Sequence, residues 1–341
     1  MVPFMIGCTT YLKKEAKGGK DLEAYGRRDF GYSFWSFCLN LCSWVCYRNY
    51  CQREMKSLMD VKITNIYNND ALPGKGLQSG HGQSFYIEYE KEKILFDIGW
   101  KGKRFLNNIN HLGISPNQIK KIVFSHGHMD HTGGLPAFLK AKTVDEPIGI
   151  IAHPSVTEPK AVKIFGLRLL SASFPKLDKK LEERIKFNFV RESFKVTTKL
   201  STTGEIRDRS EKDGTSKKIV HKVNGKWERD VLFDDLSLIL ETKDGLVLIC
   251  GCCHAGLLNT CAYVAKLFDK NIIAILGGTH MLEFSKEEVE HVGDVLEKAY
   301  GSPMLYLNHC TGKKTISQLK ARFGSEIVRP CLVGTELTFE C

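Results

Sequence analysis

The chain has 341 residues and a formal net charge of +10; 43% of its residues are hydrophobic and 26% are charged. These fractions are typical of a globular protein, and the length is sufficient for one large domain or two ordinary ones. The twelve cysteines follow no framework of the kind that stabilises small secreted domains, so we expect a reducing, cytoplasmic environment.

The positive charge is concentrated in two parts of the chain. Residues 161–230 contain 18 Lys and Arg against 10 Asp and Glu, and residues 1–58 contain 9 against 5. A basic surface can attract an anionic substrate or nucleic acid, although it can equally be a solvated face. Because residues 161–230 show no interleaved aromatic and basic pattern, we expect a small anionic substrate and no nucleic acid. The sequence is also compatible with an oligomer.

Residues 1–58 differ in composition from the rest of the chain. The stretch from Phe30 to Tyr47 contains no charged residue, and its length is near the lower limit of about 17–25 residues for a membrane helix. Small polar residues dilute this stretch, so we expect no membrane association unless residues 30–47 insert. Alternatively, translation begins at Met55 or Met59, and residues 1–58 are a leader that is not part of the native structure.

From residue 59 onwards the hydrophobic pattern predicts one domain, residues 59–341. Strands and helices alternate in two series, with short apolar runs bounded by glycine, proline and polar residues. The first series has expected strands at 61–67, 84–89, 93–96, 121–124 and 148–152, and helices at 104–112, at 115–118 and from 134 to 140. The second has expected strands at 236–241, 246–250, 272–276 and 303–307, and helices at 257–268 and from Ser285. Two such series predict a layered α/β sandwich.

A basic insertion at about residues 153–230 separates the two series. Residues 197–213 within it are polar, and we expect them to form a loop. Long loops of compact domains often cover a functional site. We therefore expect the insertion to cover the site described next.

The densest group of potential metal ligands follows the strand expected at 121–124. His126, His128, Asp130 and His131 fall within six positions. All four can donate lone pairs to a divalent cation, and a strand end would present them at the edge of a sheet. A solvated histidine-rich loop is the alternative, but four ligand-type residues directly after a strand favour a metal site.

This stretch resembles the HxHxDH signature of the metallo-β-lactamase superfamily. Leu95–Gly99 resembles the LFDxG strand end of that family, Gly251–Gly256 its GCxHxG histidine, and Leu307–Gly312 its last histidine. The similarity extends roughly over residues 60 to 335 and implies an α/β fold of four layers, αββα.

Within the superfamily, the chain is similar to the subgroup named for a dihydropterin synthase of methanopterin biosynthesis. The segments that carry this similarity are His81–Ser84, Thr203–Ile206, Asp234–Asp235, Gly277–His280 and His309–Gly312.

The resemblance implies two metal sites. The first would contain His126, His128 and His254, and the second Asp130, His131 and His309. We expect one or two zinc ions, although manganese or iron would suit these ligands nearly as well. Asp97 would orient a metal-binding histidine through its other ring nitrogen.

The chain departs from the superfamily at one metal ligand. Most members have a bridging aspartate at the end of the strand before the last helix, where this chain has Gly277 and Gly278. His280 follows closely and could compensate for it. We expect Asp130 and His280 to be the catalytic residues. Cys252 and Cys253, beside His254, are expected to be buried packing residues rather than ligands.

Substrate contacts are expected from four residues outside these metal sites. Glu205 and Arg207 belong to the insertion, and His81 lies in a glycine-rich loop. Thr311 precedes a glycine that could begin a helix, where backbone N–H groups can bind an anion.

Three functions are compatible with these features. The subgroup resemblance implies a metal-dependent transferase that acts on a diphosphate-bearing pterin and releases pyrophosphate. The alternative is a metallohydrolase that uses metal-bound hydroxide on an ester or phosphodiester. A non-enzymatic protein that binds metal or nucleic acid is the third hypothesis.

Overall fold

The computed structural model describes residues 60–164 and 166–341. The expected leader, residues 1–58, and its apolar stretch at 30–47 lie outside these residues. Contacts between elements group Leu58–Cys341 into one unit. No helix in the described ranges is long and apolar enough to cross a membrane.

The first half of the chain forms most of a seven-stranded sheet, in the order β16-β1-β2-β3-β4-β5-β8. Its strands are β1 (Asp60–Tyr67), β2 (Ser84–Tyr89), β3 (Glu92–Phe96), β4 (Lys121–Val123), β5 (Ile148–Ala152), β8 (Ile185–Phe189) and β16 (Glu336–Glu340). Strands β1, β2 and β3 pair antiparallel, whereas β3, β4, β5 and β8 pair parallel. The carboxyl ends of the parallel strands therefore lie at one edge of the sheet.

The second half forms a five-stranded sheet in the order β15-β14-β13-β12-β9. Its strands are β9 (Leu200–Thr202), β12 (Leu238–Glu241), β13 (Leu246–Cys250), β14 (Ile272–Gly277) and β15 (Met304–Leu307). Strands β13, β14 and β15 are parallel, so they too end at a common edge.

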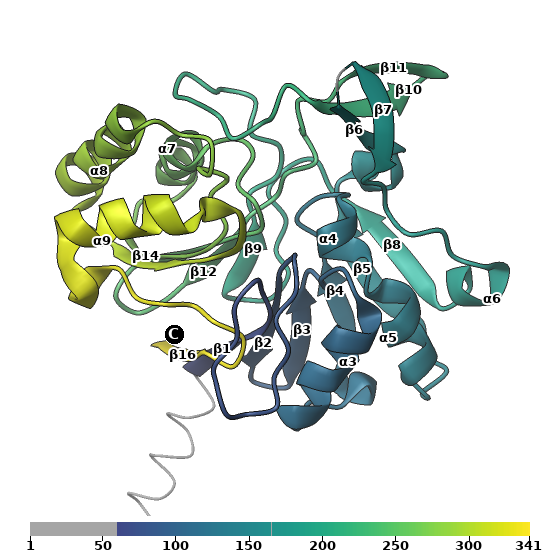
Figure 1. Cartoon of the computed structure of the whole chain (residues 1–341). Helices are drawn as coiled ribbons and strands as arrows, with labels where there is room; N and C mark the ends of the chain where they lie inside the picture. The colour runs from purple at the N-terminus through teal and green to yellow at the C-terminus, as the bar shows by residue number, and fades with distance from the viewer. Residues whose placement is uncertain (1–59, 165) are drawn as a thin grey trace, which may run out of the picture. The chain divides into compact units, whose positions relative to one another are not determined.

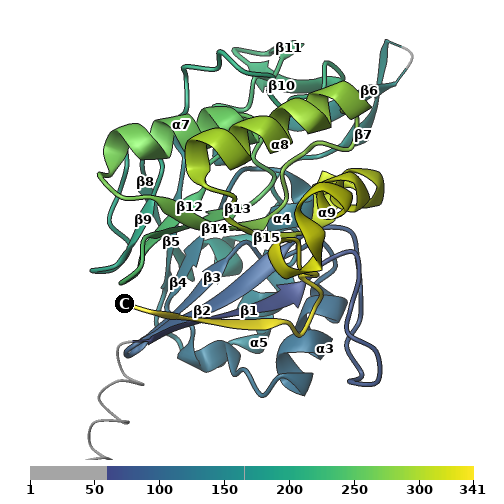
Figure 2. The same ribbon diagram turned by 90° about the vertical axis from the view of Figure 1, so that its left-hand side faces the viewer.

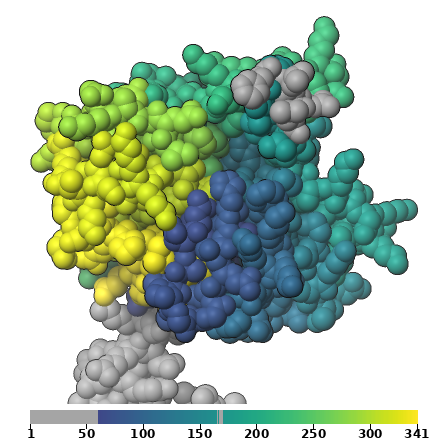
Figure 3. Space-filling view, viewed as in Figure 1, coloured from purple at the N-terminus to yellow at the C-terminus, as the bar shows by residue number. Residues whose placement is uncertain are grey.

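Helices cover the outer faces of both sheets, as Figures 1 and 2 show. On the first sheet these are α3 (Gly102–His111) and α5 (Leu135–Ala141); on the second they are α7 (Leu257–Leu267), α8 (Lys286–Tyr300) and α9 (Lys313–Ile327). Short helices are α4 (Met129–Thr132) and α6 (Lys179–Glu182), with 3-10 turns at Pro116–Gln118, Pro154–Thr157 and His309–Thr311. In the space-filling view the early segments, in blue, and the last segments, in yellow, adjoin on one face (Figure 3).

The two sheets and the helices on their outer faces make four layers of secondary structure. Three layers of buried apolar side chains lie between them. Residues of both sheets form the layer between them, while the other two layers lie between each sheet and its helices. Strand β13 shows how one strand serves two layers. Val247 and Ile249 face the first sheet, and Leu246, Leu248 and Cys250 face the helices. Successive side chains of β13 point to opposite faces of the sheet and both faces are buried, which explains its continuous apolar run. The four layers confirm the predicted αββα fold.

The expected elements agree with the structure except in the insertion and near the carboxyl end. Ser285 caps α8 through a reciprocal capping box with Glu288, as its sequence spacing suggests. The loop expected at 197–213 is wrong for Leu200–Thr202, which pair with β12. This run is too short for alternation to be recognised. The helix start expected after Thr311 is that of α9, whose first turn follows Gly312; the extent of α9 and the strand β16 were not predicted.

The insertion also contains a separate four-stranded antiparallel sheet, in the order β11-β10-β6-β7. Its strands are β6 (Lys160–Ile164), β7 (Leu167–Ser171), β10 (Ile219–Val223) and β11 (Lys226–Arg229). It lies at the upper right in Figure 1, beyond the end of β5. The expected insertion therefore combines this added sheet with β8 and β9, which belong to the two main sheets.

A buried ion cluster fixes the added sheet to the loop that carries the first histidines. The Lys160 ammonium lies 2.6 Å from Asp230 Oδ2 and 3.1 Å from Asp234 Oδ1. Asp234 Oδ2 accepts a hydrogen bond of 2.8 Å from the Gly127 N–H. Burial opposes the charge on Lys160, but the carboxylates of Asp234 and Asp230 outweigh it and raise the pKa of this lysine.

Replacement of Lys160 by methionine tests this cluster. Lys160→Met leaves two carboxylates buried without their cation, and removing one partner of a buried pair costs about 3–5 kcal/mol. We expect the urea midpoint of unfolding to fall accordingly. The control is Lys266→Met, which removes an exposed ion pair with Asp208 and should change the midpoint little. Equal midpoints for the two variants would contradict a stabilising role for the cluster.

Candidate metal centre

Histidines from both sheets meet where the parallel strands end. His126 and His128 follow β4, His254 follows β13, and His309 follows β15. Each side chain extends from a loop whose start is fixed by a central strand. Rigid strands that carry loops in this way are a common basis for functional sites.

The first three histidines form a compact group. Ligand nitrogens of His126, His128 and His254 all lie within 4.8 Å of one another, and His126 Nε2 is 2.9 Å from His128 Nδ1. His128 Nε2 and both ring nitrogens of His254 are buried and have no hydrogen-bond partner among residues 60–164 and 166–341. Buried polar atoms without partners are rare, and a bound cation would take one nitrogen from each ring, including one of the two from His254. The residues present therefore fit a metal ion.

Burial also keeps these three rings neutral. It lowers the pKa of His126 and His254 well below the ordinary histidine value, and neighbouring imidazoles lower it further. Burial lowers the pKa of His128 to about 3. A neutral imidazole presents the lone pair that a metal requires, so no proton has to be displaced before binding.

A second group surrounds the Asp130 carboxylate. Its Oδ2 lies 3.2 Å from His81 Nε2, 3.3 Å from His309 Nε2 and 3.7 Å from His131 Nε2. Burial opposes the charge on Asp130, but these histidines hold the pKa of its carboxyl well below the ordinary value. The structure thus brings together the three ligands expected for a second metal and adds His81, which is 60% exposed.

Asp97 orients His131 as expected. Its Oδ2 lies 2.6 Å from His131 Nδ1 and accepts a 2.7 Å hydrogen bond from Ser125 Oγ. Although burial lowers the basicity of His131, the charges of Asp97 and Asp130 raise its pKa to about 9. The contact at Nδ1 turns Nε2 toward the cluster. Asn69 Oδ1, 3.1 Å from His309 Nδ1, has the same relation to His309.

Two adjacent aspartates anchor the loops that bear the ligands. Asp234 accepts the hydrogen bond from Gly127 described above. Asp235 Oδ2 accepts a hydrogen bond of 2.9 Å from the Ala255 N–H, next to His254. Sequence reasoning singled out Asp234-Asp235 only through the subgroup resemblance. The residues around Asp234 and Asp235 form no sequence pattern that would indicate their contacts with the loops at Gly127 and Ala255.

The two adjacent cysteines have different surroundings. Cys253 packs in the layer between the second sheet and its helices, as expected, with its Sγ 3.3 Å from Thr260 Oγ1. Cys252 lies inside the cluster instead, with its Sγ 3.1 Å from His131 Nε2. It is a member of two of the four candidate ligand groups found among the described residues. Sequence reasoning missed this because alternation alone does not distinguish the two thiols.

His280 lies beside the first group of histidines. Its ring centroid is 4.4 Å from that of His254, and burial lowers its pKa. In the described part of the chain it belongs to none of the candidate ligand groups.

Three of the four residues expected to contact substrate lie away from the cavities beside the histidines. Glu205 pairs with His153, Arg191 and Arg207. Thr311 is fully buried, and its Oγ1 accepts hydrogen bonds from Thr279. Among the described residues, neither Glu205, Arg207 nor Thr311 lines the two cavities next to the histidines. Of the four expected contacts, His81 lines both.

Two adjoining cavities open onto the cluster. One, of about 300 Å³, is lined by His128, Asp130, Cys252 and His254, with Trp100 at its wall. The other, of about 510 Å³, extends toward the start of α9. Both share His81, His280, His309 and Cys310.

The insertion contributes an apolar wall to the smaller cavity. Val162, Leu170 and Ile219, from the added sheet, line it. The insertion thus forms part of the wall of the smaller cavity only, and no lysine or arginine of its described residues lines either cavity. Lys313, at the start of α9, lines the larger one.

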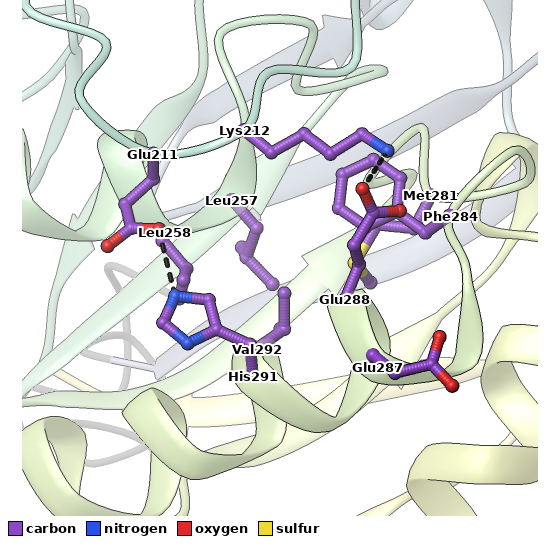
Figure 4. Close-up of a pocket in the computed structure, with 10 residues that line it drawn as sticks. All are labelled: Glu211, Lys212, Leu257, Leu258, Met281, Phe284, Glu287, Glu288, His291 and Val292. Atoms are coloured by element: carbon purple, nitrogen blue, oxygen red, sulfur yellow. Dashed lines mark hydrogen bonds and ion pairs between the residues drawn. The ribbon is translucent and has the colours of Figure 1, made fainter.

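A third cavity, shown in Figure 4, is separate from the cluster. It measures about 250 Å³ and has an apolar floor that includes Leu257 and Val292. Ion pairs from the 211–212 segment to α8 cross its rim. None of its lining residues, all in the described ranges, belongs to a candidate ligand group.

The fold and this cluster define an αββα protein with a histidine-rich metal centre, and comparison with known proteins gives its family. Residues 78–207 match the family model of the metallo-beta-lactamase superfamily. A curated relative from Methanocaldococcus jannaschii, "7,8-dihydropterin-6-methyl-4-(beta-D-ribofuranosyl)-aminobenzene-5'-phosphate synthase", is 30% identical over 79% of this chain and 94% of its own. The chain therefore belongs to the metallo-β-lactamase superfamily, and the resemblance drawn from its motifs is confirmed.

The chain is also similar to two further proteins. An uncharacterized protein of the same organism is 27% identical over 70% of this chain and 87% of its own. The solved structure of Tm1679, described as a metal-dependent hydrolase of the beta-lactamase superfamily, superposes with a TM-score of 0.68 at 26% identity. It covers 81% of this chain and 98% of the other. The fold thus implies divalent metal binding.

Neutralising Asp97 tests its influence on the metal centre. Asp97→Asn removes the charge that faces His131 Nδ1, and losing such an outer contact weakens metal affinity by about 10–100-fold. We expect this loss in zinc competition with a chromophoric chelator. The matched control is Asp208→Asn, at an exposed carboxylate that pairs with Lys266 and is far in sequence from the histidines of the cluster. Equal zinc affinity of the two variants would contradict the role of Asp97.

Proposed function

We propose that this protein is a metal-dependent transferase of the dihydropterin-synthase type. It would join an aminobenzene ribosyl phosphate to a dihydropterin methyl diphosphate and release pyrophosphate. The observation that carries the proposal is the similarity to the Methanocaldococcus jannaschii synthase, which extends over 94% of that protein. The cavities and the histidine cluster described above support it.

In this proposal His126, His128 and His254 hold one metal ion, and Asp130, His131 and His309 hold a second. Zinc suits the imidazole-rich first group best. The bound metal would supply positive charge to neutralise the departing diphosphate. The chain itself keeps the imidazoles of the first group neutral, and Asp97 and Asn69 fix the orientation of His131 and His309.

The two cavities suit a reaction of two substrates. The smaller one has an aromatic and apolar wall, with Trp100 and Leu170, against which a flat pterin ring could pack. The larger one adjoins it at His309 and includes Lys313, whose ammonium could pair with the phosphate of the aryl partner. The basic insertion would then act at long range, by attracting both anions.

His280 is suited to remove a proton. When the arylamine nitrogen bonds to the pterin methylene carbon, the bond from that carbon to the diphosphate oxygen breaks. The amine then has to lose a proton. His280 lines both cavities, and because burial lowers its pKa it is neutral near pH 7 and can accept that proton.

A metallohydrolase is the second candidate. The description of Tm1679 as a metal-dependent hydrolase favours it. The same residues would serve, with Asp130 orienting the attacking water or accepting its proton. The transfer reaction differs in requiring the aryl partner before diphosphate is released.

An assay with both substrates tests the proposal. The metal-loaded protein, given the pterin methyl diphosphate and the aminobenzene ribosyl phosphate, should form the coupled product and pyrophosphate, as followed by liquid chromatography and mass spectrometry. Omitting the aryl partner should abolish pyrophosphate release. His128→Ala, which removes a ligand, should abolish coupling, whereas Cys253→Ser should retain it. Release of pterin alcohol and pyrophosphate without the aryl partner would contradict the transferase and favour the hydrolase.

A further inference from the structure

The end of β14 has no room for a side chain at either of its two glycines. A Cβ atom on Gly277 would lie 2.1 Å from the Cys250 carbonyl oxygen. One on Gly278 would lie 2.6 Å from the Gly251 carbonyl oxygen and 2.7 Å from Cys310 Sγ. The superfamily usually has an aspartate at this position. Here the chain has glycine, and the neighbouring backbone and Cys310 leave no space for an aspartate side chain.

The Cys252 thiol occupies a position between the two groups. Its Sγ lies within 4.8 Å of a ring nitrogen of His126 and one of His131, and similarly close to His309 Nε2 or Nδ1. His126 belongs to the first group and the other two histidines to the second. Cys252 is only 3% exposed, so its sulfur faces the cluster and not solvent.

We propose that Cys252 is a thiolate ligand of the metal ion held by His131 and replaces the absent bridging carboxylate. A bound cation favours the deprotonated form of a coordinating thiol, so the thiol proton is released when the ion binds. The proposal rests on the metal centre of the proposed function, but it does not depend on the substrate.

Cys253 and Cys310 are less suited than Cys252 to be the thiolate ligand. The Cys253 thiol contacts Thr260 in the apolar layer on the far side of the loop. Cys310 is partly exposed, and its sulfur accepts a hydrogen bond of 3.3 Å from the backbone N–H of His280. It shares one candidate ligand group with Cys252 and His309, whereas Cys252 also belongs to the group of His126 and His131.

A sulfur ligand changes which metals the second site prefers. Thiolates favour zinc, cobalt and iron over manganese and magnesium, which prefer oxygen ligands. With Cys252 as a ligand, zinc becomes the expected ion for both sites, and manganese is disfavoured at the second.

Cobalt substitution tests this assignment without an activity assay. The full chain, freed of metal and titrated with Co²⁺, should develop the near-ultraviolet charge-transfer absorption that marks a sulfur–cobalt bond. Cys252→Ser should lose this absorption and bind the second equivalent of cobalt more weakly. The matched controls Cys253→Ser and Cys310→Ser should keep it. Circular dichroism would verify that all three variants are folded.

The other outcomes are also decisive. Absorption that persists in Cys252→Ser, or that disappears in either control variant instead, would overturn the assignment to Cys252. Cobalt bound to the unmodified chain without this absorption would overturn it too, and so would the absence of bound cobalt. Absorption that depends on Cys252 in a protein that forms no coupled product would support the thiolate ligand and contradict the proposed reaction.

Discussion

The packing of five buried histidines where the parallel strands of both sheets end is the constraint on which the rest of the site depends. His126, His128, His131, His254 and His309 are each at most 8% exposed. A buried polar group without a partner costs about 1–3 kcal/mol, and three ring nitrogens of these histidines have no partner among the described residues. A bound cation would take one nitrogen from each ring and so remove part of this cost, and binding of metal would therefore also stabilise the folded loops.

The layered fold and the outer contacts serve this cluster. In both sheets the parallel strands lead into the loops that carry the histidines. The apolar layers fix these strands relative to one another. Carboxylates then set the loops: Asp97 orients His131, while Asp234 and Asp235 hold the backbone beside His126 and His254. Lys160 connects the same network to the added sheet, which forms one wall of the smaller cavity.

Much of this arrangement could be predicted from the sequence, because it is encoded locally. Alternating apolar runs and the cap at Ser285 indicated most strands and helices, and the close spacing of His126, His128, Asp130 and His131 indicated a ligand loop. The contacts that depend on folding could not be predicted. Cys252 and Cys253 have the same local pattern, yet only one thiol faces the cluster. Glu205 and Arg207 have the charge expected of substrate contacts, but they pair with each other.

Elemental analysis of metal per chain tests the central claim most directly. The full chain, purified without added metal and then reconstituted with zinc and dialysed, should contain close to two equivalents of zinc, and His128→Ala should contain fewer. A chain that remains without metal after reconstitution, or a His128→Ala variant that retains the full amount, would contradict the metal centre on which this account rests.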